Sequence, residues 1–469
     1  MAMNELHAKL RALFHPRNVA VIGASENTGK LGCHVMMSLT RSGFEGGIIP
    51  VNPGAETIMG IPAYASLYDA KMPIDLAIVA LPAKAVPTVI KDCAARGVKG
   101  IVLITAGFKE IDDPIGGELQ ASLRELADEA GIPVVGPNTF GMINLHHKLN
   151  ASFTPEFSWV KKGGVSLVSQ SGGISHLLAF TAMRSNAGFS KIVGLGNRLN
   201  VDFADMVSFL MEDEDTKVIA LYIEGIDDPR RLMHSVKTGD GKKPVVVYKT
   251  GSAVTGNRAS LSHTGTLAGR HEIYMGAFRQ AGLCCVDGSQ SLIELSQALS
   301  VCSLPTGPRI AVLSGQAGPG MEACDACEAY GLEIVTFSDR TQRAINALLP
   351  PLALRSNPVD MGPAWYDAAA VQGIVQNVLE DENVDGLILL TVFASANRDV
   401  VSYISKTLMD WHQKKPVLTC FPAPPGIWDK EIEELESAGA IRNLPTPQRA
   451  AKIMSLLWQY NQLKKNTWS

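Results

Sequence analysis

The fold of the N-terminal part of the chain is decided by the stretch Val19-Ala20-Val21-Ile22-Gly23-Ala24-Ser25-Glu26-Asn27-Thr28-Gly29-Lys30-Leu31-Gly32, in which a continuous apolar run passes directly into a glycine-rich turn. Such a run is typical of a parallel strand that is buried on both faces and leads into a helix. Similar runs follow at 47–51, 76–80, 100–104 and 133–136. This alternation of short apolar runs with longer segments predicts a Rossmann-like domain, a parallel sheet with helices on both faces.

Two further series of apolar runs predict two more domains of the same class. The second series lies at 165–168, 191–193, 218–223, 244–248 and 283–286, and the third at 309–313, 333–335, 386–390 and 416–419. Irregular segments at 153–164 and 304–308 separate them. At about 150 residues per domain, a length of 469 residues also suggests three. We therefore expect three doubly wound α/β domains in series, at 1–150, 160–304 and 308–469.

The composition is that of an ordinary globular protein. Hydrophobic residues make up 46% and charged residues 19% of the chain, and the net charge is −4, which gives no general attraction to nucleic acid or to anionic membranes. The N-terminus lacks a basic region followed by an apolar run, and no stretch approaches the ~18 apolar residues of a spanning helix. We expect a cytoplasmic enzyme with no nucleic-acid or membrane partner.

The eight cysteines are scattered and lack the spacing of a small disulfide-bonded domain. Cys324 and Cys327 have the spacing of a redox or zinc half-site, but no second pair accompanies them. We interpret the two as small apolar residues of a helix, and we expect reduced thiols and no metal site.

The turn from Gly23 to Gly32 suits a phosphate group at a helix N-terminus, because glycine lets the backbone approach the ligand and free N–H groups point outward. It is not a Walker A loop, since its spacing is one residue too long and Leu31 replaces the magnesium-binding hydroxyl. It is not a nicotinamide fingerprint either, because the next strand ends in Asn52-Pro53-Gly54 without a carboxylate. The alternative is a turn that merely packs a helix on a strand.

A second turn of this kind, Ser169-Gln170-Ser171-Gly172-Gly173, follows the run at 165–168. It predicts an anion site at a helix N-terminus, although an N-cap serine would explain the hydroxyls equally well. Glu224 ends the strand predicted at 218–223, at the edge of the sheet where α/β proteins gather their sites. A carboxylate there could hold one nitrogen of a histidine, or be a plain surface acid.

His263 is flanked by the small residues Ser262, Thr264 and Gly265. A histidine with such neighbours has room to act on a bound group, and we expect it on a loop that enters a helix. The hypothesis is a histidine that carries a covalent intermediate, with a structural histidine as the alternative.

In their order along the chain these motifs resemble the alpha subunit of NDP-forming acyl-CoA synthetases, also called ADP-forming acetate–CoA ligases, which are relatives of succinyl-CoA synthetase. The resemblance covers nearly the whole chain. It rests on the segments 21–25, 51–53, 105–108, 136–141, 169–173, 196–197, 222–225 and 262–265.

The resemblance implies a Rossmann-like CoA-binding domain followed by two flavodoxin-like ligase domains. The implied CoA site consists of Gly23, Ala24, Ser25, Lys30, Asn52, Pro53, Gly107 and Asn138. In the first ligase domain the resemblance implies that His263 is phosphorylated and that Glu224 orients it. The phosphoryl group would be held by Ser169, Ser171, Gly172 and Gly173.

The implied reaction converts acyl-CoA, phosphate and ADP into a carboxylic acid, CoA and ATP, through an acyl phosphate and phosphohistidine. The chain leaves no room for the ATP-grasp module of this family, so we expect a beta subunit that holds Mg-ADP or Mg-ATP. The turn at 315–320 has fewer glycines than the family pattern, which leaves a phosphate role there open.

Two alternatives remain, a non-catalytic acyl-CoA-sensing scaffold and a nicotinamide oxidoreductase. The missing ribose carboxylate disfavours the oxidoreductase. The presence of His263 and the absence of an acetyltransferase segment disfavour the scaffold. The sequence does not identify the acid, the subunit stoichiometry, or the choice of ADP over GDP.

Overall fold

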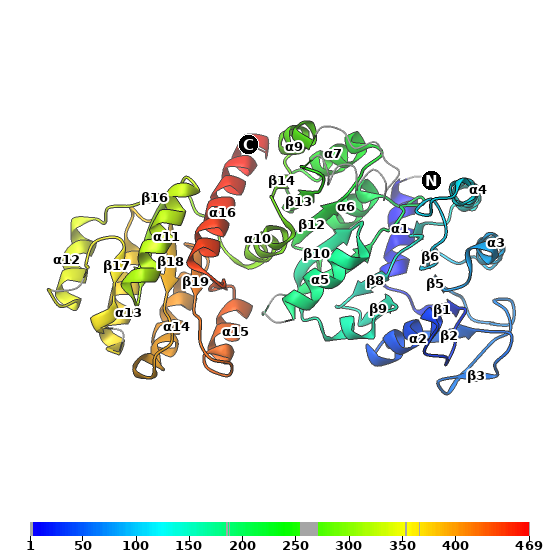
Figure 1. Ribbon diagram of the computed structural model, residues 1–469, viewed down its shortest axis with the longest axis horizontal. Helices are drawn as coiled ribbons and strands as arrows, with labels where there is room; N and C mark the ends of the chain where they lie inside the picture. The colour runs from blue at the N-terminus through cyan, green and yellow to red at the C-terminus, as the bar shows by residue number, and fades with distance from the viewer. Residues whose placement is uncertain are drawn as a thin grey trace. The chain divides into compact units, whose positions relative to one another are not determined.

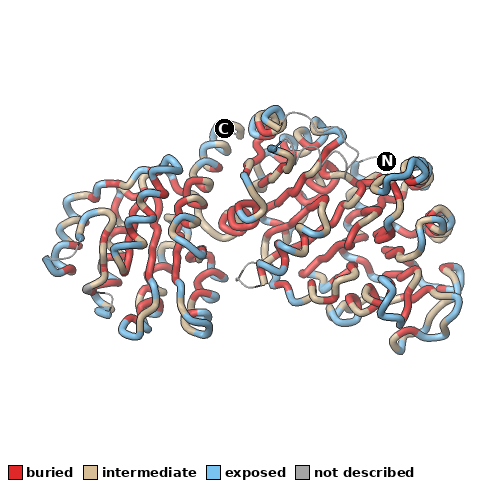
Figure 2. Tube along the Cα trace, in the orientation of Figure 1, coloured by how far each residue is buried: buried red, intermediate tan, exposed pale blue. Residues whose placement is uncertain are grey.

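The computed structural model describes residues 3–183, 186, 188–253, 271–351, 354–364 and 366–468. The chain divides into two compact units, Met1–Ile293 and Glu294–Ser469. Figure 1 shows that both units are layered α/β structures, in which parallel strands lie between helices. Figure 2 shows that the strands are buried while the outer faces of the helices are exposed.

The first sheet of unit 1 has five parallel strands in the order β2-β1-β5-β6-β7. Its elements are α1 (Met3–Phe14), β1 (Asn18–Ile22), α2 (Leu31–Arg41), β2 (Gly47–Val51), β5 (Leu76–Val79), α3 (Val86–Ala95), β6 (Gly100–Leu103), α4 (Pro114–Glu129) and β7 (Val134–Val135), with a small hairpin of β3 (Thr57–Ile58) and β4 (Ile61–Pro62). The strands β5 and β6 are buried along their whole length, as expected for a sheet covered on both faces. Because β2 lies on one side of β1 and β5 on the other, the strand order reverses at β1.

The second sheet of unit 1 has seven strands in the order β14-β13-β12-β10-β11-β8-β9. Its elements are β8 (Gly141–Asn144), β9 (Leu149–Ser152), the 3-10 helix η2 (Pro155–Trp159), β10 (Lys162–Ser169), α5 (Gly172–Ala182), β11 (Phe189–Gly194), α6 (Phe203–Glu212), β12 (Val218–Ile223), α7 (Pro229–Thr238), β13 (Val245–Lys249), α9 (His271–Gln280) and β14 (Cys284–Cys285). The strand order again reverses at the first parallel strand, β10, which lies between β11 and β12.

The pair β8 and β9 is a feature that the apolar runs did not predict. Both strands are antiparallel additions to the edge at β11. Their buried residues include Asn144, Asn150 and Ser152, so they lack the continuous apolar run of the parallel strands. Asn150 Nδ2 donates to Thr154 O at 3.0 Å. This hydrogen bond fixes the start of the segment 153–164, which the sequence analysis predicted to be irregular.

The helix α1 joins the two sheets of unit 1. Its Leu13 packs on β6 at Gly100, where a Cβ atom would come within 2.0 Å of the leucine. The ring of Phe14 stacks on Phe209 of α6 at 5.2 Å, and its carbonyl accepts a hydrogen bond from Asn144 Nδ2 at 3.0 Å. The first two sheets therefore form one compact unit.

Unit 2 contains a third parallel sheet, in the order β16-β15-β18-β19-β20 with β17 beside β15. It consists of β15 (Arg309–Ser314), α11 (Ala317–Ala329), β16 (Glu333–Ile334), α12 (Asp339–Leu348), β17 (Val359–Asp360), α13 (Ala368–Glu380), β18 (Gly386–Leu390), α14 (Val400–Trp411), β19 (Val417–Cys420), α15 (Asp429–Ser437), β20 (Arg442–Asn443) and α16 (Pro447–Trp468); α10 (Ser289–Val301) precedes it. The expected α/β class, with parallel-sheet domains in series, is confirmed.

Cys324 and Cys327 lie on α11, and burial raises the pKa of Cys327 to about 12, as expected of an unreactive thiol. None of the helices in the described part of the chain combines the length and apolarity needed to span a bilayer.

Candidate functional site

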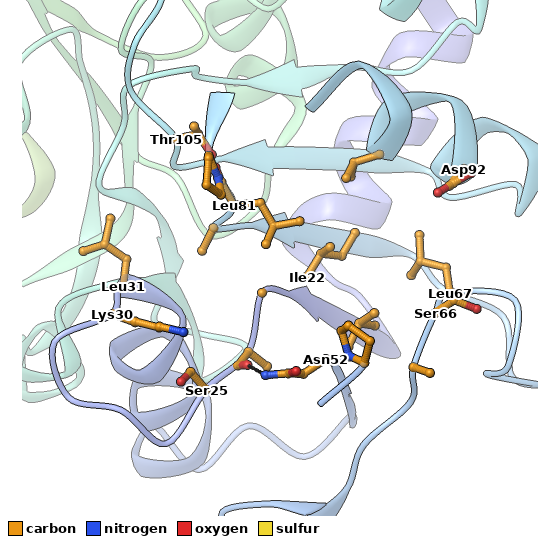
Figure 3. A pocket seen from close by; sticks show the side chains of 18 of the residues that line it. Ile22, Ser25, Lys30, Leu31, Asn52, Ser66, Leu67, Leu81, Asp92 and Thr105 are labelled. Carbon is orange, nitrogen blue, oxygen red and sulfur yellow. Dashed lines mark hydrogen bonds between the residues drawn. The ribbon is translucent and has the colours of Figure 1, made fainter. Parts of the chain in front are cut away.

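A cavity of about 690 Å³ opens at the carboxyl ends of β1, β2 and β5, where the strand order of the first sheet reverses (Figure 3). This edge is where open α/β sheets bind their ligands. The cavity is lined by Ile22, Gly23, Ala24, Ser25, Lys30, Leu31, Val51, Asn52, Pro53, Ala65, Ser66, Leu67, Ala80, Leu81, Pro82, Val89, Asp92, Thr105 and Ala106.

Two glycines bring the start of α2 to this cavity. Gly23 has a φ of +91°, and a Cβ atom there would lie 2.7 Å from the carbonyl oxygen of Ala80. A Cβ atom on Gly32 would lie 1.9 Å from the carbonyl oxygen of Gly23. The turn therefore does pack a helix on a strand, and the same packing presents the N-terminus of α2 to the cavity. Lys30 occupies the N-cap position, without a side-chain cap.

Asn52 holds the two loops of the cavity together. Its Nδ2 donates to Ala24 O at 2.8 Å, and its Oδ1 accepts the N–H of Gly54 at 2.9 Å. Ser25 is buried, and its hydroxyl accepts the N–H of Asn27 at 3.1 Å. These residues thus shape the cavity whether or not they also contact a ligand.

Gly107 and Asn138, also expected to bind a cofactor, are not among the lining residues of this cavity. They belong to a polar network around Glu110 at the boundary of the two sheets. Glu110 accepts the N–H of Gly107 at 2.5 Å and the amide of Asn197 at 2.5 Å, and Asn138 Nδ2 donates to Asn197 Oδ1 at 3.4 Å. Burial alone would raise the pKa of Glu110, but the hydrogen bonds from Gly107 and Asn197 lower it overall.

The second turn lies where the strand order of the second sheet reverses. Ser171 caps α5, with its hydroxyl accepting the N–H of Ile174 at 3.4 Å, and Gly172 and Gly173 form the first turn of that helix. The Ser169 hydroxyl donates to Ser171 O at 2.9 Å and accepts the Ser171 N–H at 3.1 Å. Ser171 therefore has the capping role considered for these serines, whereas Ser169 bonds the backbone of Ser171. This arrangement leaves the helix N-terminus at the same edge of the sheet as Glu224.

Gln170 connects this turn to Glu224. Its Oε1 accepts the N–H groups of Glu224 at 3.1 Å and Gly225 at 3.0 Å, and its own N–H donates to Tyr222 O at 3.1 Å. The structure thus brings together the predicted phosphate turn and the predicted carboxylate. The sequence analysis assigned no role to Gln170. Its position between the end of a strand and the N-cap of a helix could have indicated one.

Lys249, at the end of β13, holds the same turn from the other side. It is 4% exposed, and its Nζ donates to the carbonyls of Glu224 and Thr250, each at 2.8 Å. Nζ also lies 5.6 Å from the ring centre of Tyr274. Burial lowers the pKa of Lys249, and Glu224 opposes that shift. The sequence analysis did not predict a role for Lys249. A lysine at the end of an apolar strand was the feature that could have indicated one.

His263 lies outside the described residues, within the segment 254–270. The described chain on either side lies beside Lys249, because Thr250 follows it directly and the centre of the Tyr274 ring lies 5.6 Å from its Nζ. Among the described residues, no group of three His, Cys, Asp or Glu side chains is arranged to hold a metal ion.

Two family models match the chain. Residues 17–144 match a CoA binding domain, and residues 162–299 match a succinyl-CoA ligase like flavodoxin domain. The first match contains the cavity and the second contains Ser169, Gln170 and Glu224.

Relatives match over nearly the whole of this chain. The acetate–CoA ligase [ADP-forming] II subunit alpha of Pyrococcus furiosus is 36% identical, over 97% of each chain. The acetate–CoA ligase [ADP-forming] I of Archaeoglobus fulgidus is 36% identical over 97% of this chain and 64% of its own length. Among solved structures, the dinucleotide forming acetyl-coenzyme A synthetase 1 of Ca. Korarchaeum cryptofilum, in complex with phosphate and ADP, matches with a TM-score of 0.89, 31% identity and 98% coverage of both chains.

Proposed function

This chain belongs to the family of ADP-forming acetate–CoA ligase alpha subunits, and we propose that it works in the cytoplasm as the alpha subunit of a reversible ligase. The enzyme is an acid–thiol ligase that converts acyl-CoA, phosphate and ADP into a carboxylic acid, CoA and ATP. The observation that carries this function is the agreement of the sequence with an ADP-forming acetate–CoA ligase alpha subunit over 97% of the chain, and of the fold with a dinucleotide forming acetyl-coenzyme A synthetase over 98%.

The cavity at α2 is the proposed CoA site. Lys30, the one basic residue among the described residues that line it, and the N-terminus of α2 favour the phosphates. Leu67, Val89 and Leu81 offer apolar walls for the rest of CoA. The volume of about 690 Å³ suits a ligand of this size. We keep Gly107 and Asn138 as proposed CoA-binding residues. They lie outside the cavity lining, in the adjoining hydrogen-bond network of Glu110.

The proposed phosphoryl site lies at α5. A phosphate oxygen attacks the thioester carbonyl, the C–S bond breaks, and an acyl phosphate and the CoA thiol result. The neutral imidazole of His263 then attacks the phosphorus atom and the carboxylate leaves. Glu224 accepts the other imidazole N–H, which selects the tautomer and stabilises the phosphohistidine. Ser169, Ser171, Gly172 and Gly173 offset the phosphoryl charge at the helix N-terminus.

The proposed partner is an ATP-grasp beta subunit that holds Mg-ADP or Mg-ATP and receives the phosphoryl group from His263. The name of the Pyrococcus relative, a subunit alpha, supports such a partner. The covalent intermediate divides a three-substrate reaction into two transfers, so the two subunits can contribute separate half-sites.

The test is incubation of the purified chain, alone and with its candidate beta subunit, with labelled phosphate and a panel of acyl-CoAs. We expect acid-labile, base-stable label on the wild type and none on His263→Ala. His234→Ala is the matched control, because His234 is exposed on α7. CoA binding without label, even with the partner and ATP, would favour the sensing scaffold instead.

A further inference from the structure

Asp92 is an acidic residue in a cavity that should hold three phosphate groups. It is the only carboxylate among the lining residues, all of which lie in the described part of the chain. It is half-buried on α3, one turn after Val89, so both side chains face the cavity. A carboxylate next to a phosphate would repel it.

The charged groups of the cavity lie at opposite ends. Figure 3 shows Lys30 and Ser25 at one end, beside the start of α2, and Asp92 with Ser66 and Leu67 at the other. The diphosphate of CoA belongs at the first end, where a cation and a helix N-terminus face it. The end at Asp92 therefore receives an uncharged part of the ligand.

The surroundings of Asp92 suit a flat apolar ring with a hydrogen-bond donor on its edge. Leu67 and Val89 supply buried apolar walls, 4% and 7% exposed. The adjacent Ser66 is held by Asp69, whose Oδ2 accepts its N–H at 2.9 Å and its hydroxyl at 2.7 Å. These two hydrogen bonds fix the turn at Ser66 beside the cavity.

The Asp92 carboxylate is oriented but not neutralised by the protein. The Tyr68 hydroxyl donates to its Oδ1 at 3.1 Å. Arg96, the C-cap residue of α3, instead directs its guanidinium at the carbonyl of Ala70. Among the residues that the structure describes, the Asp92 side chain forms no ion pair and its hydrogen bond uses Oδ1, so Oδ2 can accept a hydrogen bond from a ligand.

We infer that Asp92 recognises the adenine ring of CoA, by accepting a hydrogen bond from the exocyclic 6-amino group. Adenine is uncharged and presents that amino group on its edge. The inference rests on the proposed CoA site and adds its orientation, with adenine between Leu67 and Val89 and the diphosphate at Lys30. Asp92 is then a specificity residue that selects adenine over bases without this donor.

The experiment compares binding of CoA and of 1,N6-etheno-CoA, in which the 6-amino donor is lost, to the full chain by calorimetry. We expect the wild type to prefer CoA by about tenfold, the usual effect of one hydrogen bond to a charged group. Asp92→Ala should bind both ligands with similar affinity, and Asp92→Asn should keep part of the preference, because its amide oxygen still accepts. Glu125→Ala, an exposed change on α4 outside the cavity, should match the wild type.

Lys30→Ala provides the second comparison, because it should lower the affinity for CoA and for 1,N6-etheno-CoA by the same factor. An Asp92→Ala protein that still prefers CoA by the wild-type factor would overturn the assignment of Asp92 while leaving the CoA site in place. A wild type that binds neither ligand would remove the CoA site itself, and this inference with it.

Discussion

The side-chain oxygen of Gln170 accepts the backbone N–H of Glu224 at 3.1 Å, across the point where the strand order of the second sheet reverses. The two residues are 54 positions apart in the sequence. The same oxygen accepts the N–H of Gly225 at 3.0 Å, so one buried amide fixes the distance between the N-terminus of α5 and the turn that carries Glu224.

Gln170→Ala should lower both stability and the rate of phosphorylation. It leaves the N–H groups of Glu224 and Gly225 without their acceptor, at a cost of about 1–3 kcal/mol. Gln170→Glu keeps an acceptor but adds a negative charge beside the proposed phosphoryl site. That variant should melt near the wild-type temperature and still phosphorylate slowly. Equal phosphorylation rates in all three proteins would show that this contact is structural only.

Glu224→Gln should slow phosphorylation of the chain by at least about tenfold, because a neutral amide does not stabilise the cationic phosphoimidazole as a carboxylate does. Its CoA affinity should be unchanged, since CoA is proposed to bind in the first domain. The contacts of Gln170 and Lys249 are to the backbone of Glu224, so the fold of the turn should survive. An unchanged rate of label incorporation would contradict the role proposed for Glu224.

Lys30→Ala should weaken CoA binding by about fivefold, as expected for the loss of one partly exposed contact between a lysine and a phosphate. The loss should shrink at high salt, because the interaction is partly screened. Lys71→Ala is the matched control, since Lys71 is exposed and outside the cavity. Titration at two ionic strengths measures both effects, and equal affinities for the two variants would argue against a phosphate contact at Lys30.

Lys191→Met should destabilise unit 1 by about 3–5 kcal/mol. The Lys191 side chain is fully buried on β11, and its Nζ lies 2.6 Å from Asp213 Oδ2, so its loss leaves a buried carboxylate without its cation. Lys242→Met is the control, because Lys242 and Glu212 form an exposed pair at 3.5 Å that contributes at most about 1 kcal/mol. Urea unfolding of both variants measures the contrast; equal midpoints would mean that Asp213 finds other donors.

The stability of the chain should fall on acidification partly through Asp213. Burial would raise the pKa of this carboxyl, but hydrogen bonds from Lys191 and Thr216 outweigh it and hold the pKa below its usual value. A group with a lowered folded-state pKa stabilises the protein above its unfolded pKa of about 3.9, and that contribution disappears as the pH falls through the folded value. Melting temperatures of Asp213→Asn should therefore depend less on pH between about 4 and 2 than those of the wild type.

The parallel strands could be predicted from the sequence, whereas the hairpin β8–β9 could not. A strand buried on both faces must be continuously apolar, and β5, β6, β12 and the last four residues of β1 are. The strands β8 and β9 instead bury Asn144, Asn150 and Ser152, whose polar groups are satisfied by hydrogen bonds to distant parts of the chain. No local pattern shows such partners in advance.

The residues of the cavity at α2 were also partly predictable from the sequence. Gly23, Ser25 and Lys30 belong to one turn, and the residues Asn52 and Pro53 end the next strand, so the rule for strand ends places all of them at one edge. Asp92 and Leu67 come from a helix and a loop that only the tertiary structure brings to that edge. Gly107 and Asn138, assigned by resemblance, lie in the adjoining network of Glu110.

The sequence by itself determined the α/β class, the turns at both helix N-termini and the family, because apolar runs, glycines and motif order are local properties of the chain. Tertiary structure decided which side chains fix the site. Gln170 reaches Glu224 and Lys249 reaches the same turn only because β10, β12 and β13 end side by side. Hydrogen bonds between distant turns depend on strand order, which the pattern of any single segment does not contain.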